Sequence, residues 1–255
     1  MKKELAIITG ATSGIGRGLT ITLTARGITV LAIGRNTEKL AELTKLPDSI
    51  RIVPYKCDIT REIDIVTVVD RVRAFNDTHE LKYLVHNATV LDPIKPLTDV
   101  TAKELNMQID VNVTGPMLLT NKLLQYFKKE ARILFISTGA SRTAITNVVP
   151  HCAAKAAQAI LAKGYKDELK NREILAGIVE PGITDTPAQA YVRSLSSDVL
   201  PFADIARKIY NEDGLSTSAD CAKLLSTLLC DVEKNKFSDI WPWQLTNKEH
   251  LEYLK

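Results

Sequence analysis

A glycine-rich segment near the start of the chain carries the residue types and the spacing that bind phosphate groups. Gly10, Gly14 and Gly16 recur within Thr9–Gly16, between a short apolar run and a helical pattern. Glycines let the backbone approach a pyrophosphate, and the N-terminus of the following helix supplies N–H donors and positive potential. A glycine-rich stretch alone can be a simple tight turn, but the strand before it and the helix after it argue against that alternative. The segment therefore predicts a dinucleotide site.

The end of the second apolar run bears on which dinucleotide the site accepts. In an NAD-preferring site an acidic residue at this point holds the ribose 2′-hydroxyl. This chain has Gly34 there and then Arg35, whose guanidinium suits the charge-assisted, often bidentate recognition of a 2′-phosphate. NADP(H) is therefore the expected cofactor. NAD(H) stays open as an alternative, because the preference rests on one residue that can also be a plain surface arginine.

His151 and Lys155 form a second pair of residues with chemical potential. Lys155 follows His151 by four residues in a helical pattern that begins near Pro150, so the two side chains share one helix face. Histidine is a common general acid or base. The positive N-terminus of the helix and the lysine cation both disfavour an imidazolium at position 151. A neutral imidazole is a far poorer proton donor, so catalysis through His151 would favour lower pH.

Short apolar runs alternate with helical patterns from one end of the chain to the other. Most of the runs have four to six residues and are apolar on both faces, as expected for strands buried in a parallel sheet. This alternation predicts one α/β domain over residues 1–255, a doubly wound, mostly parallel Rossmann-type sheet with helices on both faces. The expected strands are Leu5–Thr9, Thr29–Ile33, Ile50–Tyr55, Leu81–His86, Ile133–Ser137 and Leu175–Val179, and the expected helices are Gly14–Arg26, Thr37–Leu46, Ile63–Phe75, Ala102–Asn112, Pro116–Lys128 and Pro150–Leu169.

One long irregular stretch interrupts this alternation, at about residues 183–214. A loop of that length in a compact domain usually covers a functional site or hides a helix, so we expect a substrate lid that contains a short helix. Tyr191 in this lid is the tyrosine best placed to reach the pocket. The C-terminal Ile240–Trp243 segment suits either a subunit contact or the rim of the pocket.

The composition of the chain excludes several functional classes. The 255 residues include 33 Lys or Arg and 30 Asp or Glu, which is too even a balance for nucleic-acid binding by charge. No apolar window is long enough for a transmembrane helix, and the short apolar run Leu5–Ile8 argues against a secretory signal. Four scattered cysteines without a Cys/His cluster predict no metal site and fit a reducing cytoplasm.

The motifs together resemble the short-chain dehydrogenase/reductase superfamily over nearly the whole chain. Residues 9–16 have the family spacing Thr-Gly-x-x-x-Gly-Ile-Gly, and residues 181–186 match its Pro-Gly-x-x-x-Thr segment. The sequence around Asn87 is similar to the family's Asn-Asn-Ala-Gly, with Thr89 in place of the glycine. The resemblance implies the following cofactor-binding residues: Gly10, Ser13, Gly14, Ile15, Gly16, Arg35, Asp58, Ile59, Asn87, Lys155, Pro181, Gly182, Thr184 and Thr186.

The same resemblance implies four catalytic residues. Thr138 takes the position of the family's serine, which positions the carbonyl oxygen, and Lys155 takes that of its lysine, which binds the nicotinamide ribose. Asn112 matches the family's asparagine, which holds a water in the proton relay. His151 stands where the family has the tyrosine that supplies the proton. Because an imidazole reaches less far than a phenol, His151 would donate the proton either directly or through a bridging water.

The branch that the chain resembles, and the change at His151, leave two functions open. Ala188–Ser194 and Ile209–Leu215 look like the benzil reductase and sepiapterin reductase branch, which reduces vicinal dicarbonyls with NADPH. One hypothesis is therefore an NADP(H)-dependent carbonyl reductase with a small-molecule diketone-like substrate. The other is an NADP-binding regulatory module with little or no turnover. Relatives pair through the helices corresponding to residues 116–128 and 150–169, so the resemblance also implies a homodimer or homotetramer.

Overall fold

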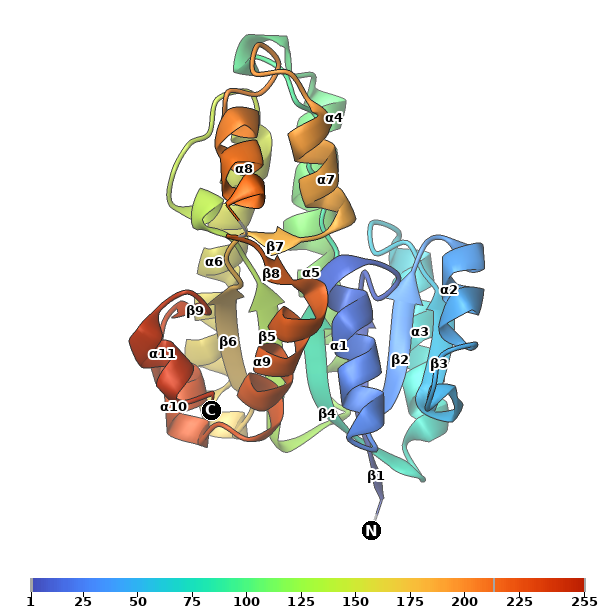
Figure 1. Cartoon of the computed structure of the whole chain (residues 1–255). Coiled ribbons are helices and arrows are strands. Elements are labelled where there is room, and N and C mark those ends of the chain that lie inside the picture. Colours follow the sequence, from blue (N-terminus) through green and yellow to red (C-terminus); the bar gives the residue numbers. More distant parts are fainter. Residues whose placement is uncertain (1, 213, 255) are drawn as a thin grey trace.

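The computed structural model describes residues 2–212 and 214–254, and a sheet of seven parallel strands forms its centre (Figure 1). The strand order is β3-β2-β1-β4-β5-β6-β9. The chain winds outward in one direction from β1 and in the other from β4, which opens a crevice at the carboxyl ends of these strands. The strands of this sheet are β1 (Lys3–Thr9), β2 (Thr29–Gly34), β3 (Ile52–Lys56), β4 (His79–His86), β5 (Phe127–Ile136), β6 (Leu175–Glu180) and β9 (Trp243–Gln244), and a separate pair consists of β7 (Thr184–Asp185) and β8 (Ser216–Thr217).

Helices cover both faces of this sheet. One face packs against α1, α2 and α9 through a cluster that includes Ile8 and Leu225, and the other packs against α3, α5 and α6 through a cluster that includes Ile7 and Val68. Neighbouring strand residues join different clusters because successive side chains point to opposite faces. Apolar residues on both faces confirm the predicted doubly wound α/β fold. The helices are α1 (Gly14–Ala25), α2 (Thr37–Leu43), α3 (Glu62–Phe75), α4 (Ala102–Ile109), α5 (Gly115–Leu123), α6 (Val149–Glu168), α7 (Pro187–Ser194), α8 (Phe202–Asn211), α9 (Ser218–Cys230), α10 (Lys234–Asp239) and α11 (Lys248–Glu252).

The start of β5 is the largest error among the predicted boundaries. β5 begins at Phe127, whereas the sequence pattern extended a helix over residues 116–128 and began the strand at residue 133. Phe127 pairs with Leu81, and the register then shifts before the regular ladder resumes. Glu130 has a positive φ of 65° within this irregularity. The charged residues of such a bulge lack the apolar signal of a strand, which explains the error.

The helices on either side of Asn112 are joined rather than separate. α4 leads into a π-helical turn at Asp110–Thr114, and α5 follows directly at Gly115, where the sequence pattern predicted two helices with a gap. A Cβ atom on Gly115 would lie 2.5 Å from the carbonyl oxygen of Ile59. Glycine at this position therefore allows the continuous helix formed by α4, the π-helical turn and α5 to approach the loop after β3. Widened turns of this kind are frequent at functional sites.

The segment expected to be a lid, residues 183–214, holds two helices and one short strand, where one short helix was predicted. α7 and α8 rise above the carboxyl ends of the central strands, and β7 pairs in parallel with β8 beneath them (Figure 1). The hydroxyl of Tyr191 donates to Oδ1 of Asp92 at 3.1 Å. Tyr191 is therefore tied to the loop after β4, outside the residues that line the main cleft.

The C-terminal tryptophan Trp243 belongs to the core. Trp243 is fully buried, pairs with Val179 as part of β9, and donates from Nε1 to the carbonyl oxygen of Phe237 at 3.0 Å. Trp243 itself therefore lies neither at the surface nor at the rim of the cleft, whereas a subunit contact through the partly buried residues 240–242 stays a prediction. Trp241 is half-buried, with Nζ of Lys166 5.6 Å from its ring centre.

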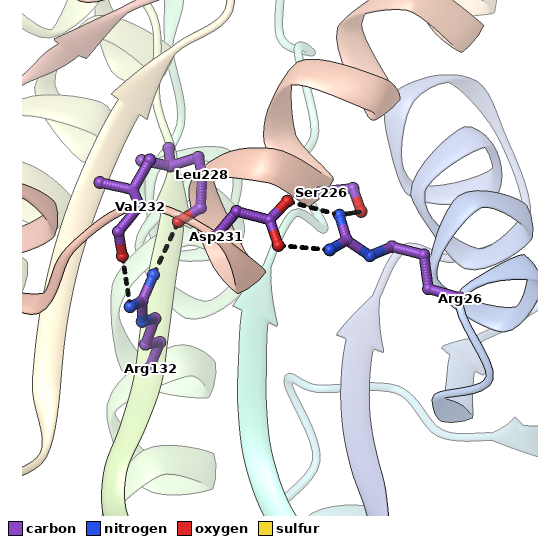
Figure 2. A network of polar contacts seen from close by, with 6 residues as sticks. All are labelled: Arg26, Arg132, Ser226, Leu228, Asp231 and Val232. Atoms are coloured by element: carbon purple, nitrogen blue, oxygen red, sulfur yellow. Dashed lines mark hydrogen bonds and ion pairs between the residues drawn. The ribbon is translucent and has the colours of Figure 1, made fainter. Parts of the chain in front are cut away.

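A buried arginine ties the end of α9 to the sheet, as Figure 2 shows. Arg132 of β5 donates to the carbonyl oxygens of Leu228 at 3.0 Å and Val232 at 2.6 Å. Arg26 of the same network forms a two-pronged ion pair with Asp231, but both of these side chains are partly exposed. Arg132 therefore satisfies main-chain carbonyl oxygens at this helix end in a buried setting, whereas Arg26 binds only side chains there and is more open to solvent.

We expect Arg132→Met to lower the free energy of unfolding by about 3 kcal/mol, because two buried carbonyl oxygens lose their donors. Arg26→Met should cost about 1 kcal/mol or less, because solvent screens its ion pair. Urea denaturation of both variants at pH 7 measures the difference. Equal losses in the two variants would contradict the role given to Arg132.

Candidate active site

A cleft of about 480 Å³ opens at the carboxyl ends of the parallel strands. Its walls come from the loops that follow β1 to β6 and from the first turns of α6 and α7. Open α/β sheets bind their ligands at this edge. The predicted site residues that line the cleft are Gly10, Ser13, Gly14, Ile15, Arg35, Asp58, Ile59, Asn87, Thr138, His151, Lys155, Pro181 and Thr186.

The glycine-rich loop has the tight geometry that a phosphate-binding turn needs. Gly10 and Gly14 have positive φ values of 66° and 50°, which glycine adopts without strain. A Cβ atom on Gly16 would lie 2.3 Å from the carbonyl oxygen of Gly10. Gly16 therefore supports the loop from behind instead of lining the cleft. Asn87 fixes the loop from the next strand, because its Nδ2 donates to the carbonyl oxygens of Thr9 and Gly10 at 3.1 Å each.

Two cations, rather than one, lie at the far end of the cleft. Lys39 lines it together with Arg35 and Asn36. Asn36 caps α2, accepting from the backbone N–H of Lys39 at 2.9 Å, so the first turn of this helix borders the cleft. Neither cation forms an ion pair with a carboxylate of residues 2–212 and 214–254. Sequence reasoning missed Lys39, although its position in the first turn of the helix that follows Arg35 indicated that it could face the same ligand.

Asp58 and Ile59 line the cleft after β3, beside these cations. Oδ1 of Asp58 accepts from the backbone N–H of Thr60 at 3.0 Å and from its hydroxyl at 2.8 Å. Asp58 therefore shapes a local turn. Neither Asp58 nor Thr60 caps the next helix, because Arg61 occupies the N-cap of α3.

Lys155 is buried at the floor of the cleft. Its Nζ donates to the carbonyl oxygen of Ile136 at 3.0 Å and to Oε1 of Gln158 at 3.1 Å. Burial disfavours the ammonium form and lowers the pKa of Lys155 to about 7. Near neutral pH this lysine can therefore gain or lose a proton, and only its ammonium form has an N–H beyond the two donated to Ile136 and Gln158.

His151 lies one helical turn before Lys155 and is also buried. Burial, and secondarily the nearby Lys155 cation, lower the pKa of His151 to about 4, against a hydrogen bond to Val90 that raises it. The bond joins Nδ1 of His151 to the carbonyl oxygen of Val90 at 2.8 Å. At neutral pH the imidazole is therefore uncharged, as the sequence argument expected from the lysine.

Two hydroxyl residues lie beside this pair, at the end of β5. Thr138 lines the cleft, and its Oγ1 accepts from the backbone N–H of Ala140 at 3.4 Å, so its own O–H can donate to a ligand. Ser137 also lines the cleft, and its buried hydroxyl has no hydrogen-bond partner among the described residues. Buried polar groups are nearly always paired, so Ser137 is a further candidate contact, which sequence reasoning missed.

Asn112 is fully buried and does not reach the cleft. Its Oδ1 accepts from the hydroxyl of Thr89 at 2.8 Å, and its Nδ2 donates to the main chain of Gln108 at 2.9 Å. Its main-chain carbonyl oxygen accepts from Nε2 of Gln158 at 3.0 Å. The amide of Gln158 thus joins the main chain of Asn112 to the ammonium group of Lys155.

The segment after β6 brings some, but not all, of its predicted residues to the cleft. Pro181 and Thr186 line it, and Thr186 also caps α7 by accepting from the backbone N–H of Gln189 at 3.2 Å. Gly182 is exposed with a φ of 78°. The structure does not bring Thr184 to the cleft, because this residue is buried in β7, where it pairs with Ser216.

The residues of the cleft fit a phosphorylated dinucleotide. One end offers the cations Arg35 and Lys39, and the middle offers a glycine turn at a helix N-terminus. The other end offers the hydroxyl of Ser137, which has no partner within the described residues, and the buried Lys155. Across residues 2–212 and 214–254, no group of three or more His, Cys, Asp or Glu could hold a metal ion. In the same part of the chain, no helix combines the length and apolar character needed to cross a membrane.

Known proteins share both the sequence and the fold of this chain. The family model described as short chain dehydrogenase matches residues 4–196. A benzil reductase ((S)-benzoin forming) of Bacillus subtilis (strain 168) is 27% identical over 253 residues, which cover 93% of this chain and 98% of the relative. A farnesol dehydrogenase of Aedes aegypti is 30% identical over 196 residues, which cover 72% and 78%.

Solved structures agree on the fold. A short chain dehydrogenase/reductase from Saccharomyces cerevisiae aligns with a TM-score of 0.87 at 21% identity, covering 99% of this chain and 100% of that one. A short chain dehydrogenase from Burkholderia cenocepacia, in complex with NADP, aligns with a TM-score of 0.78 at 23% identity, covering 95% of each chain. With the family model matched over residues 4–196, this chain belongs to the short chain dehydrogenase family and is an oxidoreductase of the Rossmann fold.

Proposed function

We propose that this protein is an NADP(H)-dependent oxidoreductase that reduces a carbonyl group of a vicinal diketone-like substrate. The observation that carries this proposal is one cleft with Arg35 and Lys39 at one end and Thr138, His151 and Lys155 at the other. NADPH, when bound, supplies the hydride. The relative from Bacillus subtilis, a benzil reductase, supports the substrate class, and benzil is the diketone we would test first.

The side chains at the catalytic end divide the remaining work. The hydroxyl of Thr138 donates to the carbonyl oxygen and orients it. Lys155 is held by Ile136 and Gln158, so its free N–H has a fixed direction for binding the cofactor ribose. His151 is the proton donor when protonated. Because the pKa of His151 is about 4, only a small fraction of the protein carries that proton at neutral pH, and reduction is slow there.

A second candidate function is an NADP-binding module with little or no turnover. The observation that favours it is the hydrogen bond from Nδ1 of His151 to the carbonyl oxygen of Val90. This bond uses the one N–H of a neutral imidazole, which leaves no proton for a substrate. Titration with NADPH followed by assay with benzil separates the two candidates. Tight binding without NADPH oxidation at any pH supports the module, and oxidation of NADPH with formation of benzoin supports the reductase.

A cellular location and an assembly state belong to the same proposal. All four cysteines are free thiols, and three of them are buried, which suits the reducing cytoplasm. Ile160 of α6 is 72% exposed, which suits association of this helix with a second copy of the chain.

The cofactor preference gives a direct prediction. We expect Arg35→Ala and Lys39→Ala each to weaken NADPH binding about tenfold, because each removes one charge-assisted contact to the 2′-phosphate. NADH binding should change less than about twofold. Fluorescence titration with both cofactors measures this, with Lys45→Ala as a control, since Lys45 is exposed outside the cleft. An equal loss for NADPH and NADH would place the two cations away from the 2′-phosphate.

A further inference from the structure

We propose that the cleft holds its ligand through a hydrogen-bond donor, the hydroxyl of an α-hydroxyketone, and that Nε2 of His151 is the acceptor. The inference rests on the proposed function and deepens it, because it states which member of a diketone and hydroxyketone pair the site binds better. A fixed tautomer of His151 and the chain of buried amides behind it carry the argument.

The partner of His151 sets its tautomer. Nδ1 lies 2.8 Å from the main-chain carbonyl oxygen of Val90, and a carbonyl oxygen can only accept a hydrogen bond. Nδ1 must therefore carry the hydrogen. In the neutral ring the lone pair is then on Nε2, which is the nitrogen left for the cleft that His151 lines.

Gln108 holds the carbonyl group of Val90 in place. Gln108 is fully buried, and its Nε2 lies 3.2 Å from the carbonyl oxygens of Val90 and Leu91 and 2.5 Å from that of Asp92. A reversed amide would turn Oε1 toward three oxygens, so the direction of this side chain is fixed. The loop after β4 therefore keeps the carbonyl oxygen of Val90, and not an N–H donor, turned toward Nδ1 of His151.

Further buried amides extend this arrangement to the catalytic lysine. Nδ2 of Asn112 donates to Oε1 of Gln108 at 3.2 Å, and Nε2 of Gln158 donates to the main-chain oxygen of Asn112 at 3.0 Å. Oε1 of Gln158 accepts from Lys155. Each of the three side-chain amides faces a backbone carbonyl oxygen, so none can reverse. A satisfied buried network of this kind favours one arrangement.

The kind of ligand that fits follows from two groups in the cleft, the lone pair on Nε2 of His151 and the O–H of Thr138. A carbonyl oxygen opposite Nε2 would meet a lone pair, whereas a hydroxyl would donate to it. The O–H of Thr138 is free to donate in the same cleft. An α-hydroxyketone has one donor and one acceptor on adjacent carbons and so satisfies His151 and Thr138 together. A vicinal diketone offers acceptors alone and satisfies only Thr138.

Calorimetric titration tests the ligand preference without catalysis. Benzoin and benzil are titrated into the full-length protein saturated with 2′,5′-ADP, which carries the 2′-phosphate but no nicotinamide and therefore supports no redox step. We expect benzoin to bind about tenfold more tightly than benzil. His151→Phe should bind both ligands equally, because it keeps the ring and removes the acceptor. Equal affinities in the parent protein would overturn the inference.

The tautomer itself has a spectroscopic signature. Two-bond correlations between ring protons and nitrogens of ¹⁵N-labelled histidine distinguish Nδ1–H from Nε2–H, and the His151 signals are those that His151→Phe removes. We expect Nδ1–H in the parent and in the control Lys103→Met, an exposed position on α4, and a mixed tautomer in Gln108→Met. Nε2–H in the parent would overturn the inference, even if Gln108→Met does not fold. If the protein binds 2′,5′-ADP but neither benzoin nor benzil, the diketone substrate of the proposed function fails and the hydroxyketone preference fails with it. If it binds both ligands with equal affinity, the inference alone fails.

Discussion

The His151→Tyr variant should reduce benzil about 100-fold faster than the parent protein at pH 7. A phenol carries a proton that it can transfer at neutral pH, and the Lys155 cation stabilises the phenolate that remains. The neutral imidazole of His151, with its one N–H bonded to Val90, has no such proton. A positioned general acid contributes roughly 10²–10⁴-fold to a rate. The measurement is kcat for NADPH oxidation at saturating NADPH.

Two controls make this prediction specific to the proton. His151→Phe fills similar space without a donor and should stay below the parent rate. The Kd for NADPH should remain within about twofold in all three proteins, because the cations and the glycine turn are untouched. A tyrosine variant that binds NADPH normally but turns over no faster than the parent would show that the proton donor is not what limits this site.

Lys155→Met should raise the free energy of unfolding by about 2 kcal/mol at pH 6 while abolishing turnover. The pKa of Lys155 is about 7 in the folded protein and close to 10.5 in the unfolded chain. The folded state thus binds this proton more weakly than the unfolded chain does. The resulting loss of folding stability is fully present below pH 7. The cost fades as pH rises toward 10.5. Met removes it but leaves the acceptors of Ile136 and Gln158 without a donor, so the net gain is smaller than the full cost.

Urea denaturation at pH 6 and at pH 9.5 measures this effect. The advantage of Lys155→Met over the parent should shrink at the higher pH. Lys163→Met, an exposed position on the same helix, is the control and should change stability by less than about 0.5 kcal/mol at either pH. A lower free energy of unfolding in Lys155→Met at both pH values would mean that burying Lys155 does not destabilise the parent protein.

The elements of this fold were predictable where burial is uniform along a segment. β2 and β6 are apolar on both faces because helices cover the sheet on both sides, and their sequences show it. The start of β5 was not predictable, since its charged bulge at residues 128–130 carries no strand pattern. β9 was also missed, because two residues of pairing around Trp243 leave no periodic signal.

In the candidate site, features that depend on neighbouring residues in the sequence were predictable, and features that depend on contacts between distant residues were not. The turn at Gly10 to Gly16 is a local structure, and its sequence fixes where a phosphate can approach. The tautomer of His151 depends on Val90 and Gln108, which lie on different elements. No spacing in the sequence reports that contact. Gln158 was overlooked for a similar reason, because its importance comes from facing both Lys155 and Asn112.

The rate at which the parent protein oxidises NADPH with benzil, followed from pH 7.5 to pH 5.5, shows whether protonated His151 is the proton donor. With a pKa of His151 of about 4, the imidazolium fraction rises about tenfold for each unit that the pH falls. The fluorescence of bound NADPH verifies that the cofactor stays in place. We expect a slow reaction at pH 7.5 that accelerates about tenfold for each unit by which the pH falls. A rate that stays level or falls toward pH 5.5, with NADPH still bound, would contradict this expectation.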